Sequence, residues 1–164
     1  MLRIRGVVMD RFLAQFSAKL DSKGRVSIPA SFRAVLAKDG HEGLFVYRAL
    51  DQPALDCGGH GLLKQIDGLL ARFDPYSEAY DSFATALLAE SEILKLDPEG
   101  RVAVTERLKA HAGIADAVVF VGKQSKFQIW EPERFRAHSE EAKTRLRAYR
   151  QSLEPGSNSS GAQG

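Results

Sequence analysis

Hydrophobic and polar residues alternate near the start of the chain, on both sides of a short polar turn. The alternation covers residues 15–20, and Val26 and Ile28 continue it after Asp21-Ser22-Lys23-Gly24. A period of two is typical of a strand with one buried face. Asp in the first position and Gly in the last are typical of a tight turn. The pattern therefore predicts two strands joined by a turn, with Arg25 on the polar face.

The same pattern occurs a second time, 76 residues later. Lys19-Leu20-Asp21-Ser22-Lys23-Gly24-Arg25-Val26 aligns with Lys95-Leu96-Asp97-Pro98-Glu99-Gly100-Arg101-Val102, and six of the eight positions are identical. A repeat at a fixed offset indicates two copies of one structural unit. We interpret residues 12–58 as the first module and residues 93–136 as the second. A module this small has little apolar surface to bury, so the two should interleave into one β-rich body.

Each module continues with a short helix and two strands. An apolar stripe follows Pro29, which pre-sets the first helical turn, and Gly40 can end that helix. In the second module Thr105 is the N-cap candidate and Gly113 ends the helix. Apolar runs predict further strands at about 44–48, 54–57, 117–122 and 126–130.

Residues outside the modules are predicted to be helical or disordered. Apolar residues at helical spacing predict two helices in a linker, residues 59–92, with Pro75 between them and Tyr76 on the second stripe. A third helical pattern runs from about Pro132 to Leu153, and we assign residues 137–153 to a separate C-terminal helix. Residues 154–164 are rich in Gly and Ser and are expected to be disordered. The fold class is thus mainly β with helices, that is, α+β.

Charge is distributed unevenly along the 164 residues. The formal net charge is +2, but residues 11–33 carry five basic and one acidic side chain, whereas residues 87–109 carry four and five. The basic balance of the first module suggests a polyanion partner. We expect the first module to meet that partner, and the second to hold the scaffold or a neighbouring subunit.

Other features exclude several classes of protein. No apolar run approaches the ~18 residues of a membrane helix, so no membrane partner is expected. The one cysteine, Cys57, cannot form an intrachain disulfide and fits a reducing, cytoplasmic compartment. The four histidines lack metal-ligand spacing, and Cys57-Gly58-Gly59-His60-Gly61 lacks the Lys and Ser/Thr of a phosphate loop, so we expect a flexible loop there. We predict no catalytic residue, no metal and no cofactor, and therefore no enzyme.

The candidate site is the first turn. Arg25 and Lys23 are predicted to contact double-stranded DNA, with Lys19 assisting through phosphate. The alternative is that Asp21 with Arg25, and Asp97 with Arg101, are ion pairs that only hold their hairpins together. Two or three phosphate contacts per chain give weak binding. Useful affinity therefore requires a homo-oligomer on repeated sites.

The doubled Leu-Asp-x-x-Gly-Arg-Val motif resembles the SpoVT/AbrB-type swapped-hairpin domain, and two copies in one chain resemble the MraZ family of bacterial transcriptional regulators. Supporting stretches are residues 19–33, 96–102, 112–114 and 127–131. The chain departs from the family pattern at residues 54–60, where a Leu-rich strand and a Trp-bearing helix start are usual.

The resemblance implies a fold, a function and site residues. It implies a pseudo-dimeric barrel of swapped hairpins, subunits arranged in rings, and binding to promoter direct repeats, mainly as a repressor of the division and cell wall gene cluster. Such a protein would be cytoplasmic and nucleoid-associated. The resemblance places DNA contact at Asp21 and Arg25. We assign Asp97 and Arg101, with the turn glycines Gly24 and Gly100, to structure or assembly. The swapped-hairpin fold also serves protein–protein modules such as antitoxins, which remain the alternative function.

Overall fold

The structure is a computed structural model that describes residues 3–4, 7–8 and 10–155. Two compact units are present, Met1–Pro132 and Glu133–Gly164. In the first unit, two short strands that pair antiparallel, β1 (Arg3–Ile4) and β2 (Val7–Val8), precede the modules. The expectation of a disordered tail falls mainly on residues 156–164, which lie outside the described residues.

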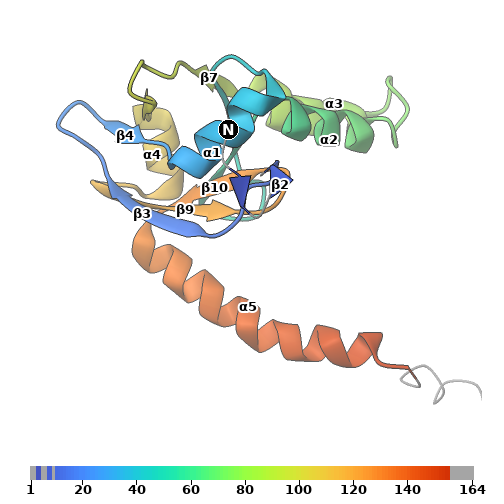
Figure 1. The fold of residues 1–164 in the computed structure, drawn as a ribbon. Helices are drawn as coiled ribbons and strands as arrows, with labels where there is room; N and C mark the ends of the chain where they lie inside the picture. The colour runs from blue at the N-terminus through green and yellow to red at the C-terminus, as the bar shows by residue number, and fades with distance from the viewer. Residues whose placement is uncertain (1–2, 5–6, 9, 156–164) are drawn as a thin grey trace, which may run out of the picture. The chain divides into compact units, whose positions relative to one another are not determined.

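A six-stranded antiparallel sheet forms the centre of the first unit (Figure 1). The strand order across the sheet is symmetric, because each strand of one half has its repeat counterpart at the mirrored place in the other half. The order is β3 (Gln15–Lys19), β9 (Ala117–Gly122), β10 (Phe127–Trp130), β6 (Ala54–Gly58), β5 (Leu44–Arg48) and β7 (Glu92–Leu94).

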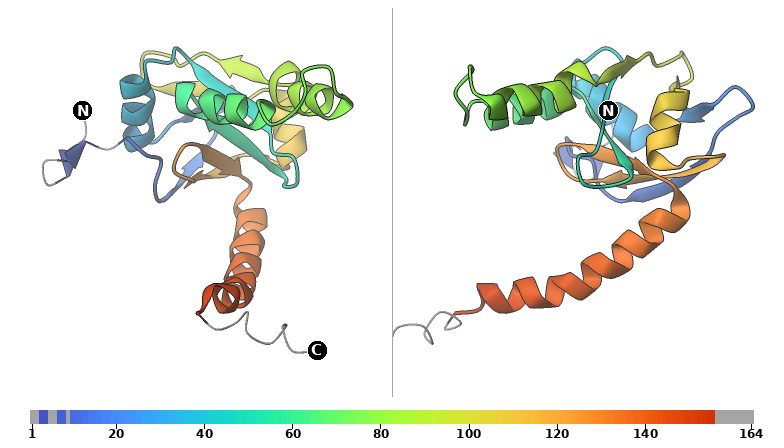
Figure 2. Two further views of the ribbon diagram at one scale, coloured as in Figure 1. Left: turned by 90° about the vertical axis from the view of Figure 1, so that its right-hand side faces the viewer. Right: turned by 180° about the vertical axis from the view of Figure 1, so that it is seen from behind.

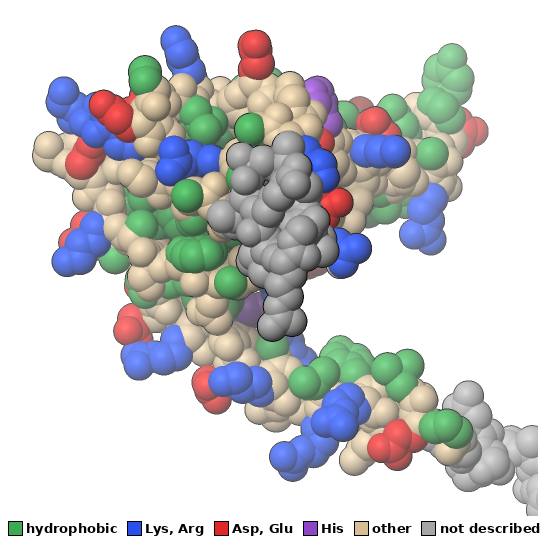
Figure 3. All heavy atoms as spheres, viewed as in Figure 1, with side chains coloured by type: hydrophobic (Ala, Val, Ile, Leu, Met, Phe, Trp, Pro, Cys, Tyr) green, Lys and Arg blue, Asp and Glu red, His purple; other side chains and the backbone are tan. Residues whose placement is uncertain are grey.

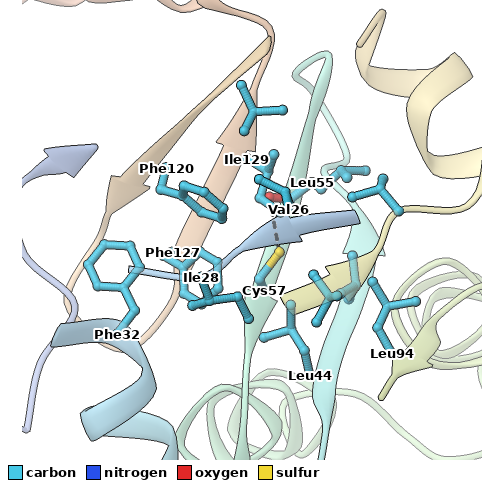
Figure 4. Close-up of a cluster of buried hydrophobic side chains, with 14 of the residues drawn as sticks. Val26, Ile28, Phe32, Leu44, Leu55, Cys57, Leu94, Phe120, Phe127 and Ile129 are labelled. Carbon is cyan, nitrogen blue, oxygen red and sulfur yellow. Dashed lines mark hydrogen bonds between the residues drawn. The ribbon is translucent and has the colours of Figure 1, made fainter. Parts of the chain in front are cut away.

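A second, two-stranded ribbon joins the two modules. β4 (Arg25–Ser27) pairs antiparallel with β8 (Arg101–Ala103), and Val26 lies opposite Val102. Both valines are buried and belong to the main core, which also contains residues of β6 and β10. Figure 4 shows Val26 and Ile28 pointing toward Leu55, Cys57 and Ile129 of the sheet. One face of the ribbon therefore covers the sheet, and the other face is open to solvent.

The two modules interleave as the sequence predicts. β3 of the first module pairs with β9 of the second, β7 of the second pairs with β5 of the first, and the ribbon takes one strand from each. The mixture of strands and helices confirms the α+β class. The six-stranded sheet is open, with β3 and β7 at its edges, so hydrogen bonds do not close the barrel that the family resemblance implies.

The module helices begin and end close to the predicted residues. α1 (Ala30–Asp39) ends at Gly40, and α4 (Glu106–Ala112) ends at Gly113, each in the left-handed conformation. The Thr105 side chain caps α4 by accepting a hydrogen bond from the backbone N–H of Leu108, at 3.4 Å. Pro29 stands at the N-cap of α1 with ψ 140°, one residue before the first helical turn in which it was expected.

The linker forms a helical layer on the other face of β5. It contains α2 (His60–Leu70), α3 (Glu78–Ala84) and a π-helical turn, η1 (Thr85–Ala89). Side chains of α2 and η1 pack on Phe45 and Tyr47 of β5, whereas Leu44 and Val46 face the main core. Figure 2 shows α2 and α3 together at one end of this unit. Tyr76 departs from the predicted stripe, because it lies in the loop between the helices and is 99% exposed.

The glycine-rich segment after Cys57 is ordered, and the expectation of a flexible loop there is wrong. β6 runs to Gly58 and α2 begins at His60. A Cβ on Gly59 would lie 2.4 Å from an Asp39 carboxylate oxygen, and a Cβ on Gly58 would lie 2.8 Å from Leu62 Cβ. The glycines let the strand turn directly into a helix that packs closely against its neighbours.

The aromatic cluster around Phe32 should dominate the stability of this unit. Its ring centroid lies 4.9 Å from that of Phe127, 5.3 Å from Phe12 and 5.4 Å from Phe16. Phe32→Ala should lower the free energy of unfolding by about 3–5 kcal/mol, because it removes this packing and leaves a cavity. Chemical denaturation measures the loss. The matched control Ile93→Ala, at an exposed position, should change stability by about 0.5 kcal/mol or less. Equal losses in the two variants would contradict this account of the core.

Candidate nucleic-acid interface

The first turn is held by the carboxylate of Asp21. Its Oδ1 accepts hydrogen bonds from the backbone N–H groups of Lys23 and Arg25, both at 2.9 Å, and its Oδ2 accepts from Arg25 Nε at 2.7 Å. The turn is closed by the N–H of Gly24, which donates to the carbonyl of Asp21 at 3.0 Å, with Gly24 at φ +76°. One acidic side chain thus fixes both the backbone of the turn and the orientation of an arginine.

The second turn repeats this geometry. Asp97 Oδ1 accepts from the N–H groups of Glu99 and Arg101 at 3.0 and 2.9 Å, and Oδ2 accepts from Arg101 Nε at 2.8 Å. Gly100 has φ +79° and donates to the carbonyl of Asp97 at 2.9 Å. Asp21 with Arg25, and Asp97 with Arg101, are therefore ion pairs within their own turns.

The two turns lie at opposite ends of the β4–β8 ribbon and are cross-linked through it. The N–H of Val104 donates to the carbonyl of Gly24, and the N–H of Ile28 donates to the carbonyl of Gly100, both at 3.0 Å. Arg101 Nη1 also reaches to within 4.0 Å of Asp21 Oδ2. The last carbonyl of each turn therefore accepts a hydrogen bond from the other module.

The outer face of the ribbon carries both arginines. In the pairing register Arg25 lies opposite Ala103, and Ser27 lies opposite Arg101, while the valines between them point inward. The Arg25 and Arg101 side chains are 32% and 29% exposed. We define the ribbon surface as this outer face together with Lys23. Lys19 is the last residue of β3 and is exposed, and in the sequence it lies shortly before the first turn.

One position makes the two turns electrostatically different. Lys23 in the first turn corresponds to Glu99 in the second, 76 residues later. Glu99 pairs with Arg101, which therefore faces three carboxylates, those of Asp97, Glu99 and Asp21. Arg25 pairs with Asp21, and its two terminal nitrogens have no hydrogen-bond partner in the described part of the chain. Residues 19–25 carry three basic and one acidic side chain, whereas residues 95–101 carry two of each.

Two further basic residues belong to this region and were missed from the sequence. Arg33 of α1 donates from Nε to the carbonyl of Ile28 at 3.1 Å and lies over Gly100. Lys109 of α4 lies over Gly24 and pairs with Glu106 at 2.9 Å. Arg33 and Lys109 are themselves 76 residues apart. Extending the repeat offset into the helices would have found them.

Hydrogen bonding lowers the pKa of both turn carboxyls. The pKa of Asp21 is lowered chiefly by the backbone N–H of Arg25, with help from the Arg25 side chain, and Arg101 lowers the pKa of Asp97 in the same way. The Asp97 carboxylate in turn raises the pKa of Arg101. Both carboxyls are therefore ionised at neutral pH, and each holds its guanidinium in place.

The cysteine and the histidines of the sequence lie apart from this surface or in other contacts, and they form no metal-binding cluster among the described residues. No group of three or more His, Cys, Asp or Glu side chains suited to a metal ion occurs among them. Cys57 is buried, and burial raises the pKa of its thiol, which makes it a poor nucleophile. His111 contacts the carbonyl of Gln52 at 3.1 Å. In the described part of the chain, no helix combines the length and apolarity needed to cross a bilayer.

Comparison with known proteins decides the family. A family model described as "MraZ protein, putative antitoxin-like" matches residues 87–152. A protein of Beijerinckia indica, named "Transcriptional regulator MraZ", is 63% identical over 145 residues, which cover 88% of each chain. The chain belongs to the MraZ family. MraZ proteins of the same name from Methylocella silvestris (60% identity, 88% of each chain) and Azorhizobium caulinodans (54% identity, 94% of this chain and 98% of the relative) are also similar.

The turn glycines of this MraZ chain should differ in their tolerance of a side chain. A Cβ on Gly24 meets nothing closer than 3.8 Å, whereas a Cβ on Gly100 would lie 2.4 Å from Arg33 Cδ. Gly24→Ala should cost about 1–3 kcal/mol of unfolding free energy from positive φ alone, and Gly100→Ala should cost more. Adding Arg33→Ala should recover part of the Gly100→Ala loss in denaturant titrations. A smaller loss for Gly100→Ala than for Gly24→Ala would show that Arg33 does not pack on this turn.

Acid should remove the contribution of the turn carboxylates. A carboxyl whose pKa is lowered in the folded state stabilises that state above its unfolded pKa of about 3.9, and the benefit disappears as pH falls through the folded pKa. The double variant Asp21→Asn with Asp97→Asn retains acceptor oxygens but loses the charge. Its melting temperature should lie clearly below that of the parent at about pH 7, and the gap should close toward about pH 3. A gap that is independent of pH would contradict this electrostatic role.

Proposed function

We propose that this MraZ-family protein is a sequence-specific DNA-binding transcriptional regulator that uses the ribbon surface to contact DNA. The observation that carries the proposal is the outward placement of Arg25 and Arg101 on a two-stranded antiparallel ribbon. A two-stranded ribbon fits the major groove of B-DNA, where base edges present a distinct pattern for each base pair. The name of the relatives, transcriptional regulator, supports the same conclusion.

Within this surface the first turn makes the principal contact. Arg25 donates to Asp21 through Nε, and its two terminal nitrogens have no hydrogen-bond partner among the described residues. Such a pair of nitrogens suits bidentate binding to guanine or to a phosphate. Lys23 and Lys19 add phosphate contacts, and Asp21 acts as a positioning residue. Arg101 is neutralised by its three carboxylates and serves the structure and the assembly.

We further propose that the protein binds promoter direct repeats as a homo-oligomer, arranged as a ring, and represses the division and cell wall gene cluster in the cytoplasm, at the nucleoid. The small number of basic groups on each ribbon surface supports oligomeric binding. Each neutralised phosphate contributes a salt-dependent slope of about −0.9, so a single subunit binds weakly. Several subunits on one DNA molecule raise the effective concentration of each contact.

The second candidate is a non-catalytic protein–protein module, which the antitoxin-like description of the family model favours. Salt separates the two functions. Binding to DNA upstream of the protein's own gene should weaken steeply as salt increases, whereas association through an apolar protein interface should not. Footprinting on that DNA, with the solution mass measured alongside, tests the proposed function directly.

Substitutions in the two turns should have opposite effects on DNA affinity. Arg25→Ala should weaken operator binding about tenfold to a hundredfold, as expected for loss of a base-reading arginine. The melting temperature of this variant should stay close to that of the parent protein. Lys23→Glu should also weaken binding. Its matched counterpart Glu99→Lys should leave binding intact or strengthen it, because it releases Arg101 from a carboxylate. Fluorescence anisotropy with labelled operator DNA measures all three.

Arg101→Ala is the control for structural effects. It should disturb the melting temperature or the solution mass more than it disturbs DNA contact. If Arg25→Ala and Arg101→Ala both bound operator like the parent protein, the assignment of the ribbon surface to DNA would be wrong.

A further inference from the structure

The C-terminal helix exposes an apolar stripe. None of the 22 residues of α5 (Pro132–Leu153) is buried, and Leu146, Tyr149 and Leu153 are 54%, 64% and 83% exposed. Their spacing of three and four residues places them on one side of the helix. Figure 3 shows hydrophobic and basic side chains exposed along this helix. A stripe with anchors at this spacing is the form in which an amphipathic helix enters a groove of a protein partner.

The same part of the helix carries uncompensated positive charge. Residues 142–153 contain four basic and no acidic side chains. Lys143 pairs with Glu140, but Arg145, Arg147 and Arg150 form no ion pair with any described residue. At 100° per residue, Arg145 and Arg150 lie on opposite flanks of the apolar stripe. The surface that receives this helix should therefore be apolar at its centre and acidic on both sides.

The linker layer offers a surface of that kind. Two neighbouring hollows of about 450 and 550 Å³ border the β5–β6 loop, and both are lined by Ala49 and Leu50. Leu50 is 51% exposed between them. The π-helical turn contributes Leu87 to the first hollow and Ala86 to the second, and π turns often occur at functional sites. We define the linker groove as these two hollows with the Leu50 loop.

The linker groove carries the opposite charge. The charged residues that line its two hollows are four acidic ones, Asp51, Asp56, Asp81 and Glu90, and two basic ones, Arg48 and Lys126. Asp56, at the floor of the first hollow, is already paired with Lys126 at 2.9 Å. Asp51 in the first hollow and Asp81 in the second form no ion pair among the described residues. These two carboxylates are opposite in charge to the flanking arginines of α5, and like those arginines they form no ion pair with a described residue.

We infer that the C-terminal half of α5 of one copy docks in the linker groove of a second copy. Leu146, Tyr149 and Leu153 would enter the hollows, and Arg145 and Arg150 would meet Asp51 and Asp81. The two surfaces are unlike, so the contact repeats head to tail and builds a closed assembly when the rotation allows closure. The inference rests on the proposed homo-oligomer and names the surfaces that hold it together.

Charge reversal in the full-length protein tests the inference. One variant reverses the helix, Arg145→Glu with Arg150→Glu, and the other reverses the groove, Asp51→Lys with Asp81→Lys. Each alone should lose the assembly in DNA-free analytical ultracentrifugation at low salt, because like charges then face one another. An equimolar mixture should reassociate into an assembly that contains both variants. The reversed helix then faces the reversed groove, and the two unaltered surfaces also face each other.

Other outcomes would overturn the inference. If the mixture stays monomeric while each variant remains folded by circular dichroism, α5 does not dock on a second copy. If helix reversal leaves the mass unchanged and weakens DNA binding instead, the basic stripe serves DNA. A further pair of variants tests whether the apolar stripe belongs to the interface. Leu146→Ser with Tyr149→Ser should dissociate the assembly, whereas Ile93→Ser on the edge strand β7 should leave it intact. The reverse result would place the interface at the sheet edge.

Failure of the inference and failure of the proposed function can be told apart. The mass is measured without DNA, so it does not depend on the ribbon surface. A monomeric helix-reversal variant should still bind DNA weakly, and Arg25→Ala should still reduce that binding. If assembly follows the charge rule but Arg25→Ala has no effect on DNA binding, the docking inference stands and the DNA assignment falls.

Discussion

The structure depends on the pairing of β4 with β8. The main core takes residues from both modules, and the ribbon brings one strand from each module over the shared sheet. Val26 and Val102 lie opposite each other at its centre. The glycine carbonyl of each turn accepts a hydrogen bond from the backbone N–H of a residue that follows the ribbon strand of the other module. Removing either copy would therefore expose the sheet and leave the glycine carbonyl of the remaining turn without the hydrogen bond that it accepts from the other module.

This arrangement lets one fold carry two different turns. The Asp-x-x-x-Arg hydrogen bonds and the left-handed glycine are the same in both turns. Lys23 and Glu99 are exposed, and each contributes only its backbone N–H to the hydrogen bonds that its turn aspartate accepts from the turn backbone. The chemistry of the surface can therefore change at these positions without changing the backbone. Under the proposed function, the local charge decides which arginine is available to a polyanion.

The sequence predicts most of this fold because the decisive signals are local. Strand alternation, the turn residues Asp21 to Gly24, and the caps Thr105 and Gly113 each act within a few residues of themselves. The repeat supplies the long-range pairing. What the sequence does not predict arises from contacts between distant segments. The packing of Asp39 on Gly59 orders a segment that looks flexible, and Arg33 reaches Gly100 from another module. The open edge of the sheet and the exposed Tyr76 also depend on how elements pack, which periodicity alone does not specify.

The most direct test of the central claim is photo-crosslinking to operator DNA from each turn. Lys23→Cys and Glu99→Cys provide attachment points for a short photo-reactive group, and the native Cys57 is buried and should remain unlabelled. The two turns lie at opposite ends of the ribbon, so a short probe distinguishes them. The account predicts strong crosslinking from position 23 and little from position 99. Equal crosslinking from both positions, or stronger crosslinking from position 99, would contradict the division of roles between the two turns.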